Sequence, residues 1–237
     1  MKFAHLNTVN TSWIDPAQQK NMCNRALAVS DTSKNSVITD TIVVTHSMGN
    51  LMLAGALATG TCTLDPSSTW VGIAGPMMGS MASDFVQDSC AGETNVVWEE
   101  IGQVTGRCPP NGALQFLAYS GRNYSSNSLE AAYSAAQESY RANVHALMCG
   151  KSHSGITSKY QAKFWALGSM ISHNSEENDG MVDFKSCAAG FPESQFGDSY
   201  RDRFYKTKLN HYDMSFRAGD SILSEAKMPV KWFECLL

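Results

Sequence analysis

Residues 41–49 read Thr-Ile-Val-Val-Thr-His-Ser-Met-Gly, a run rich in β-branched residues that ends at a serine. The first part of this run, 41–45, predicts a buried parallel strand that is apolar on both faces. Residues 48–59, which read Met-Gly-Asn-Leu-Met-Leu-Ala-Gly-Ala-Leu-Ala-Thr, predict a helix packed behind that strand. Between the two elements, Ser47 must take a strained backbone conformation, which costs about 1–3 kcal/mol. Gly49 is expected because a Cβ at this position would collide with the tight turn.

The stretch from Thr45 to Gly49 resembles the nucleophile elbow of the α/β-hydrolases, G-x-S-x-G, with Thr45 in the first glycine position. Small residues other than glycine occur there in lipase-like members of that superfamily. The resemblance implies an α/β fold with a mostly parallel sheet and helices on both faces. It also makes Ser47 a candidate nucleophile. The alternative is a buried strand-helix junction whose serine only caps the helix.

A serine nucleophile needs a base and an acid that orients the base, and α/β-hydrolases carry them in the order Ser, Asp or Glu, His. Residues 178–182 read Asn-Asp-Gly-Met-Val and follow a predicted strand at 164–171. Lipases often have their acid in a similar Asn-Asp-Gly turn, so the resemblance makes Asp179 the candidate acid. Gly180 permits the positive φ that would project this carboxylate from the strand end. Asp183 is the rival acid, and an ordinary polar turn is the alternative.

His211 is the candidate base because of its position in the chain. It follows a strand-like run at 204–208 and precedes a final helix predicted at about 219–233. Related hydrolases place their histidine in the loop between the last strand and the last helix. The other histidines fit this place less well, and a surface histidine is the alternative. We therefore expect Ser47, Asp179 and His211 to form a catalytic triad.

A second apolar strand is predicted at 70–74, and the stretch Gly-Pro-Met-Met-Gly-Ser follows it at 75–80. Lipases and esterases often carry a similar Gly/Thr-Pro-His-x-Gly-Ser stretch there, which lines the acyl pocket; Met77 replaces its histidine. A proline-bearing turn with core methionines is the alternative. His46, which precedes the candidate nucleophile, is a further candidate, although its side chain is expected to point away from Ser47. The candidate substrate-binding residues are His46, Pro76, Met77 and Met78.

The resemblance assigns the backbone N–H of Met48 to the oxyanion hole, whose second donor comes from the loop after the third strand in this family. No counterpart of that loop is found, because residues 3–9 and 16–30 match the family's fourth strand and the helix after it. We therefore expect an N-terminally incomplete hydrolase, with a truncated gene model favoured over a natural short form. Losing one oxyanion donor typically lowers turnover by about 10²–10³. The elbow strand would keep an unpaired edge unless residues 3–9 move beside it.

Between residues 81 and 159 the sequence departs from alternating strands and helices. Apolar residues at helical spacing predict a long amphipathic helix at 127–148, with Glu130 placed as in a capping box. We expect 81–159 to be a cap or lid inserted into a single domain that spans residues 1–237. The alternative is that these helices pack directly on the sheet.

Length and charge exclude several classes of protein. A chain of 237 residues with 43% hydrophobic residues suits one globular α/β domain. A formal net charge of −4 offers no basic face, so nucleic-acid binding is not expected. No apolar stretch approaches the roughly 20 residues of a membrane span, and the first residues lack the apolar region of a signal peptide.

The chain contains 7 widely spaced cysteines, without the close pairs of a zinc site or redox motif. Two N-glycosylation sequons begin at Asn10 and Asn123. Together they predict an exported protein with disulfides and one unpaired cysteine, whose pairing the sequence leaves open. The alternative is a cytosolic protein with several free core cysteines.

These observations predict a serine hydrolase that cleaves carboxylic esters, with lipid-like esters as substrates, lipid-surface contact as an option, and no metal or cofactor. Acyl transfer or the removal of a lipid anchor would use the same residues. The alternative from another class is a secreted binding protein on a hydrolase scaffold, which the missing oxyanion loop favours. The oligomeric state is left open.

Overall fold

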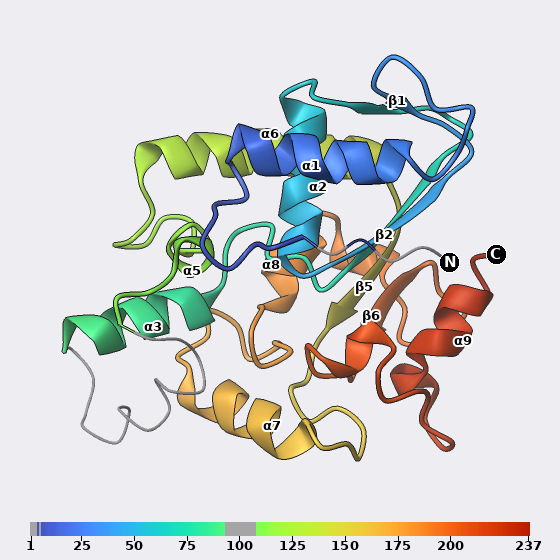
Figure 1. The fold of residues 1–237 in the computed structure, drawn as a ribbon. Coiled ribbons are helices and arrows are strands. Elements are labelled where there is room, and N and C mark those ends of the chain that lie inside the picture. Colours follow the sequence, from blue (N-terminus) through green and yellow to red (C-terminus); the bar gives the residue numbers. More distant parts are fainter. Residues whose placement is uncertain (1–3, 5, 93–107) are drawn as a thin grey trace.

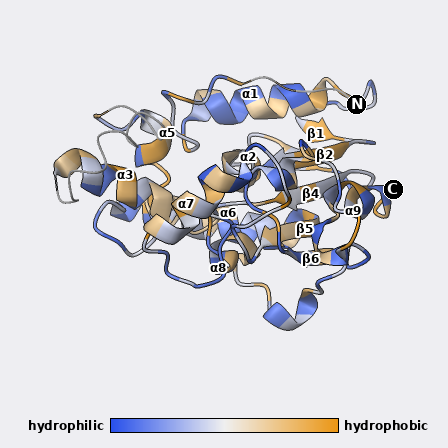
Figure 2. Ribbon diagram, turned by 90° about the horizontal axis from the view of Figure 1, so that it is seen from below, coloured by the Kyte–Doolittle hydropathy of each residue, from blue (hydrophilic) through white to orange (hydrophobic). Residues whose placement is uncertain are grey.

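The computed structural model describes residue 4, residues 6–92 and residues 108–237, and its centre is a β-sheet (Figure 1). Its strands are paired in the spatial order β2-β4-β5-β6, and every pairing is parallel. Figure 2 shows them side by side in this order. The strands are β2 (Ile42–His46), β4 (Thr69–Ile73), β5 (Val144–Gly150) and β6 (Phe204–Thr207).

The strand side chains alternate between two hydrophobic cores, because successive residues of a strand point to opposite faces. In β4, Trp70 belongs to the core on one face and Val71 to the core on the other. In β6, Phe204 belongs to the core that contains Trp70, and Tyr205 belongs to the core that contains Val71. Both faces of the sheet are therefore covered by apolar side chains.

Helices complete both cores. Residues of α1, α2 and α6 share the core that contains Trp70, and Trp232 of α9 is fully buried in the core on the opposite face. The first helix starts as predicted, because the Asp15 carboxylate accepts the Ala17 N–H at 2.8 Å. The helices of these two layers are α1 (Pro16–Leu27), α2 (Met48–Ala58), α6 (Asn127–Asn143) and α9 (Pro229–Glu234).

The other elements lie around the ends of the sheet. Figure 1 shows α3, α5 and α7 to one side of the central strands. Two short strands pair in parallel as a separate sheet. These elements are α3 (Met81–Ala91), α5 (Gly112–Gln115), α7 (Gln161–Met170), α8 (Phe184–Ala188), β1 (Val37–Ile38) and β3 (Thr63–Leu64), with 3₁₀ turns at Glu193–Gln195, Asp213–Ser215 and Glu225–Lys227.

The structure confirms the strands predicted at 41–45, 70–74 and 204–208 and the helix after the elbow. The strand predicted at 3–9 is wrong for the described residues of that stretch, 4 and 6–9, which contain no strand. The strand predicted at 164–171 is also wrong, because α7 occupies it. Phe164 and Leu167 are buried while Trp165 is exposed, which is helical spacing. A short apolar run does not separate a buried helix from a strand.

Two predicted helices are shorter than expected. The helix predicted at 127–148 ends at Asn143, and Val144 continues directly into β5. Within the range 81–159, which the sequence suggested as an insertion, β5 is thus a strand of the central sheet. The helix predicted at 219–233 begins only at Pro229, since proline suits the first helical position but not the interior.

Strand β2 lies at one edge of the sheet, so the prediction of burial on both faces is wrong. Ile42 is 49% exposed and Val44 is 37% exposed, whereas the residues that alternate with them, Val43 and Thr45, are buried. Among the described residues, β4 is the only strand paired with β2. An edge strand has a neighbouring strand on one side, which leaves its outer side chains less covered.

Disulfide bonds join distant parts of the chain. They pair Cys23 with Cys62, Cys90 with Cys108 and Cys149 with Cys187, and Cys235 is free and exposed. The first crosslinks α1 to the segment after α2, and the third joins the end of β5 to α8. The prediction of disulfides with one unpaired cysteine is confirmed. Over the described residues, no helix has the length and apolar character needed to cross a membrane.

Disulfide mapping tests this pairing. Peptides from unreduced protein should contain the three crosslinks, and a thiol reagent should label Cys235 alone. The loops closed by the crosslinks span 39, 18 and 38 residues of sequence. Each bond should therefore contribute about 3–4 kcal/mol to the free energy of unfolding, and reduction should lower Tm. A different pairing, or labelling of another cysteine before reduction, would contradict the structure.

Candidate active site

Ser47 sits in a strained turn between β2 and α2. Its φ is 55° and its ψ is −132°, values that residues other than glycine rarely adopt. Its backbone N–H donates to the carbonyl of Ile73 in β4 at 3.0 Å, which joins the turn to the neighbouring strand. The serine side chain does not cap the helix, which excludes the capping role considered from the sequence. The strained serine therefore has the geometry that the elbow sequence predicts.

Asn50, which is fully buried, ties this turn together. Its side-chain amide donates to the carbonyls of Ser47 at 3.0 Å and Ile73 at 2.9 Å. Its Oδ1 accepts the hydroxyl of Thr45 at 2.7 Å, and that hydroxyl accepts the Trp70 Nε1–H at 2.7 Å. Thr45, which departs from the family's glycine, thus supplies a buried hydrogen bond to the turn.

The expected steric role of Gly49 is wrong. A Cβ at this position would lie 3.7 Å from the Thr45 Cβ, which is an ordinary contact. The glycines crowded against Asn50 are Gly72 in β4 and Gly75 after it, where a Cβ would lie 2.9 Å from the Asn50 Oδ1 and 3.0 Å from the Asn50 Cβ, respectively. The close approach occurs between the turn and β4, so the local pattern around the serine did not reveal it.

The structure brings Ser47, Asp179 and His211 into one hydrogen-bonded chain. Nε2 of His211 lies 2.9 Å from the Ser47 Oγ, and Nδ1 lies 2.8 Å from Oδ2 of Asp179. The three residues gather at the carboxyl ends of β2, β5 and β6. At Gly150, the last residue of β5, a Cβ would lie 2.7 Å from the Asp179 Cβ, so glycine leaves room for the acid.

Asp179 is held by its own turn. Its Oδ1 accepts the backbone N–H groups of Met181 at 2.9 Å and Val182 at 2.7 Å, and Gly180 has the positive φ that the sequence predicted, 91°. Its backbone carbonyl accepts the N–H of His211 at 3.0 Å. Because Oδ2 accepts Nδ1–H, the other nitrogen of the imidazole is left to accept the serine hydroxyl proton.

Asp183, the rival acid, is directed elsewhere. Its carboxylate contacts His173 Nδ1 at 2.8 Å and accepts the Asn174 N–H at 3.2 Å. It is fully buried with these partners. No contact joins it to His211 in the described part of the chain.

His46 contacts the backbone of the candidate base. Its Nε2 lies 2.8 Å from the His211 carbonyl oxygen, and the two ring centroids are 4.8 Å apart. Burial, followed by the neighbouring His211, lowers the pKa of His46 to about 3. The imidazole is therefore neutral near pH 7, and its Nε2–H donates to the carbonyl. This differs from the substrate-binding role expected from the sequence.

Asp213 is a residue that the sequence analysis missed. Its buried carboxylate accepts the Ile156 N–H at 2.9 Å, the Ser158 hydroxyl at 3.0 Å and the Asn210 side-chain amide at 2.7 Å. Burial raises its pKa, and these hydrogen bonds oppose that shift. It ties the loop that carries His211 to residues 156–158. A carboxylate two positions after a candidate loop histidine was the signal available in the sequence.

The loop after β4 fits the predicted acyl pocket in part only. Pro76 and Met77 are buried, and Met77 belongs to the core of α2 and α6. Neither presents surface to a substrate, which agrees with the alternative of core methionines. Met78 is half-buried in a different apolar cluster that also contains Met181 and Tyr212, next to the acid and the base.

Met48 is the first residue of α2, so its N–H has no acceptor within the helix. This N–H follows the serine directly and lies at the positive, N-terminal end of the helix dipole. In the described residues, no cluster of three or more His, Cys, Asp or Glu side chains is arranged to hold a metal ion.

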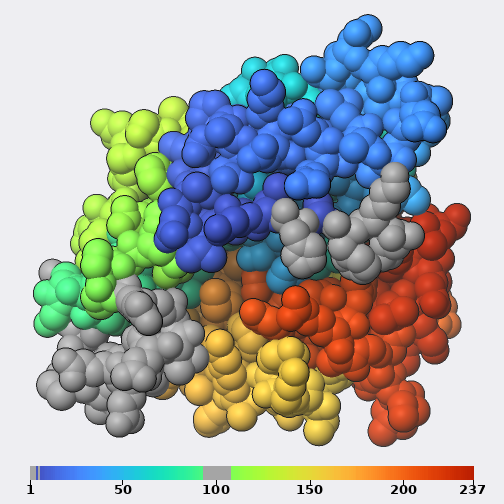
Figure 3. All heavy atoms as spheres, viewed as in Figure 1, coloured from blue at the N-terminus to red at the C-terminus, as the bar shows by residue number. Residues whose placement is uncertain are grey.

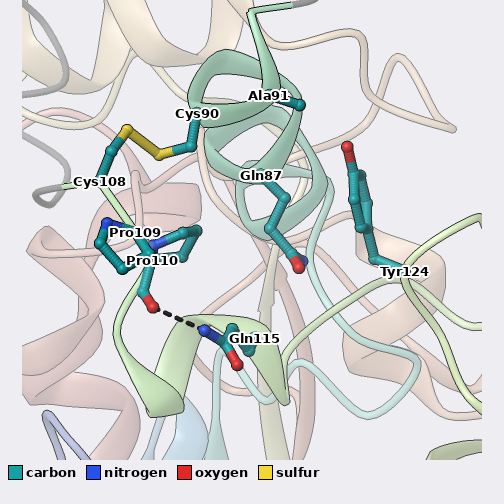
Figure 4. Close-up of a pocket in the computed structure, with 8 residues that line it drawn as sticks. All are labelled: Gln87, Cys90, Ala91, Cys108, Pro109, Pro110, Gln115 and Tyr124. Carbon is teal, nitrogen blue, oxygen red and sulfur yellow. Dashed lines mark hydrogen bonds between the residues drawn. A yellow bond between two sulfur atoms is a disulfide. The ribbon is translucent and has the colours of Figure 1, made fainter.

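A hollow of about 530 Å³ opens elsewhere, between the end of α3 and the segment around α5 (Figure 4). Its walls include the Cys90–Cys108 disulfide, Gln87 and Tyr124, and Gln115 at its base donates to the Pro110 carbonyl at 2.8 Å. None of its lining residues belongs to the serine, histidine and aspartate cluster. The hollow is therefore separate from this site.

No protein-family model matches the chain, and neither does any curated protein. Among solved structures, it is similar to the lipase BlEst2 of Bacillus licheniformis in its mature form, with a TM-score of 0.56 and 12% identity over 96% of this chain and 74% of that lipase. Lower similarity is found with the Staphylococcus hyicus lipase (TM-score 0.40, 11% identity, 82% and 68% coverage) and lipase 1 of Pelosinus fermentans (TM-score 0.37, 15% identity, 89% and 73% coverage). At 12% identity, the first likeness shows the fold alone. The chain thus has a lipase-like, α/β-hydrolase-like fold, as its elbow predicted.

The half-buried, neutral His46 should make stability depend on pH. Its pKa is about 3 in the folded protein and near 6.5 when unfolded, so between these values the unfolded chain binds a proton that the folded chain does not. The free energy of unfolding should fall by up to about 1.4 kcal/mol per pH unit as the pH drops through this window. His46→Asn should have a flatter curve in denaturant titrations from pH 7 to 3.5.

Burial raises the pKa of Asp84 to about 6, so the folded protein binds a proton that the unfolded chain has already lost. Asp84 therefore makes the free energy of unfolding rise as the pH drops, opposite to the effect of His46. Wild type and His46→Asn both contain Asp84, so the difference between their stability curves reports the contribution of His46 alone. His145→Asn, which removes an exposed histidine, is the matched control. Parallel curves for wild type and His46→Asn would contradict the prediction.

Proposed function

We propose that this protein is a serine hydrolase that cleaves carboxylic esters through Ser47, His211 and Asp179. The observation that carries the proposal is the pair of hydrogen bonds to His211, at 2.9 Å from the serine and 2.8 Å from the aspartate. A neutral imidazole between a hydroxyl and a carboxylate can take the serine proton and share the resulting positive charge. The strained turn at Ser47 supports the same conclusion, because such strain concentrates at reactive sites.

The reaction follows from these contacts. As the Ser47 Oγ bonds to the ester carbonyl carbon, its proton passes to Nε2 of His211, and the carbonyl electron pair moves onto the oxygen. The Met48 N–H donates to that oxyanion. Collapse of the intermediate breaks the bond to the alcohol, which leaves with the proton from Nε2. Water then adds to the acyl carbon and gives a proton to Nε2, and collapse releases the acid and returns that proton to Ser47.

An apolar ester fits the surroundings of the site. Met78, Met181 and Phe164 share an apolar cluster with Tyr212, next to His211. The fold of BlEst2, a lipase by name, supports the same substrate class. We further propose that α3, α5 and α7, which lie beyond the sheet layers, form a cap over the site and exclude water from it (Figure 1).

The proposal includes an extracellular location and, with it, glycosylation. Structural disulfides persist in oxidising compartments, and this chain contains three. The asparagines of both sequons, Asn10 and Asn123, have exposed side chains. An apolar ester substrate, a cap over the site and an extracellular location are thus parts of one proposal.

A fluorophosphonate probe tests the nucleophile. The folded protein should be labelled on Ser47 and should hydrolyse p-nitrophenyl esters, whereas Ser47→Ala should lose the label and at least about 10⁴ in kcat. Ser134→Ala is the matched control, because this exposed serine lies on α6 and outside the hydrogen-bonded chain. A folded sample that neither labels nor cleaves esters would favour the alternative of a non-catalytic binding protein.

The acid is tested by comparing two buried aspartates. Asp179→Asn should lower kcat by about 10⁴, because an amide cannot hold the imidazole in the correct tautomer or stabilise its positive charge. Asp183→Asn should change kcat far less, since this carboxylate contacts His173 instead. Circular dichroism should show that both variants remain folded. The reverse ranking would reassign the acid to Asp183.

A further inference from the structure

An aromatic wall adjoins His211. The ring of Tyr212 lies 4.9 Å from the Tyr160 ring and 5.2 Å from the Phe164 ring, centroid to centroid. Phe164 also lies 6.4 Å from the imidazole of His211. Tyr160 and Phe164 lie at and within the start of α7, so this wall joins α7 to the loop of the candidate base. In Figure 3, the gold surface around α7 lies beside the orange-red surface of this loop.

Two cations lie on this wall. The Arg217 guanidinium carbon is 5.4 Å from the centre of the Tyr212 ring, and the Lys159 Nζ is 5.0 Å from the centre of the Tyr160 ring. Both side chains are exposed. Within the described part of the chain, neither cation forms an ion pair with a carboxylate. Their charges are therefore open to a ligand.

The positive field of these cations reaches the neighbouring groups. Hydrogen bonds from Lys159 and then Arg217 lower the pKa of the Tyr160 hydroxyl. After burial and the neighbouring His211, Arg217 is also among the charges that lower the pKa of His46, the residue before the candidate nucleophile. Arg217 thus contributes a positive potential at the residue that precedes Ser47.

The stretch of chain around Lys159 is rich in lysine and contains no acid. Residues 151–175 contain Lys151, Lys159 and Lys163 and no Asp or Glu, in a chain whose formal net charge is −4. Around His211, the nearest acid in sequence is Asp213, whose buried carboxylate accepts hydrogen bonds from Ile156, Ser158 and Asn210. Among the described residues it forms no ion pair with Lys159 or Arg217. A basic rim in an acidic protein is selective for negative ligands.

We infer that the natural substrate is an ester that carries a fixed negative charge, such as a phosphate, beside the bond that is cleaved. Arg217 and Lys159 would bind the charged group while the apolar cluster holds the acyl chain. Guanidinium groups bind phosphate and carboxylate oxygens through paired N–H donors, which suits Arg217 to this task. This inference rests on the proposed function, because it names the substrate class of the same site.

Matched soluble esters test the inference. The probes are 1,2-dihexanoylglycerol 3-phosphate and 1,2-dihexanoylglycerol, both used as monomers below their aggregation limits. The ratio of kcat/KM values, anionic over neutral, should be about ten, because two exposed cations act on one multiply charged group. The ratio should approach one at about 1 M salt, where the screening length is about 3 Å.

Charge removal on the wall should abolish this preference. Lys159→Gln and Arg217→Gln should each lower the ratio about threefold, and the double variant should bring it near one. Lys20→Gln, which removes an exposed charge from α1, should keep the wild-type ratio. A wild-type ratio near one, or an unchanged ratio in the double variant, would overturn the inference while leaving ester hydrolysis intact.

Equilibrium binding separates this inference from the proposed function. In a Ser47→Ala background, turnover is absent by design, yet the anionic ester should bind about tenfold more tightly than the neutral ester. Adding Lys159→Gln and Arg217→Gln should remove the difference. Equal binding of the two esters would overturn the inference, as would inorganic phosphate alone binding as tightly as the anionic ester.

Discussion

The positive φ of Ser47 is strained, and hydrogen bonds from the buried side chain of Asn50 stabilise this conformation. Strain of this kind costs about 1–3 kcal/mol, and each buried hydrogen bond contributes about 0.5–1.5 kcal/mol to stability. Asn50 links the carbonyls of Ser47 and Ile73, so the serine is tied to β4 as well as to α2. Thr45 and Trp70 complete this network from β2 and β4. The hydroxyl position therefore depends on three elements at once.

The second component of the site, His211, lies in a loop and needs anchors of its own. Its carbonyl accepts from His46, its N–H donates to the Asp179 carbonyl, and Asp213 binds the loop to residues 156–158. Space for the last anchor comes from Gly155, where a Cβ would lie 2.1 Å from Oδ2 of Asp213. Anchors on several sides hold the imidazole between its partners before any ligand binds, which is the kind of preorganisation that catalysis requires.

The fold is a common framework, whereas the residues at the rim of the site are particular to this chain. A parallel sheet with a strained serine after one strand is a framework on which many chemistries occur. The distinguishing features here lie outside the sheet, in the loop before α7 and the loop after β6. There Lys159 and Arg217 sit on tyrosine rings without carboxylate partners in the described structure.

Local patterns in the sequence were sufficient for the strand, serine and helix at 42–58 and for the strands at 69–73 and 204–207. They also pointed to the Asn-Asp-Gly turn and the loop histidine. These features were predictable because each depends on neighbours along the chain, such as β-branched runs and turn residues. Element types failed where a short apolar run fits either structure, as it did for α7 and β5.

Only the tertiary structure decided which distant groups meet. It selected Asp179 over Asp183 as the neighbour of His211, and it directed His46 to a carbonyl and Met77 into the core. It also placed Asp213, Lys159 and Arg217 around the site. Apart from the position of Asp213 two residues after the candidate histidine, no local pattern indicates these outcomes, because each depends on how loops from separate strands pack against one another at the end of the sheet. The sequence by itself determined the strained turn and its candidate partners, whereas long-range packing determined their contacts.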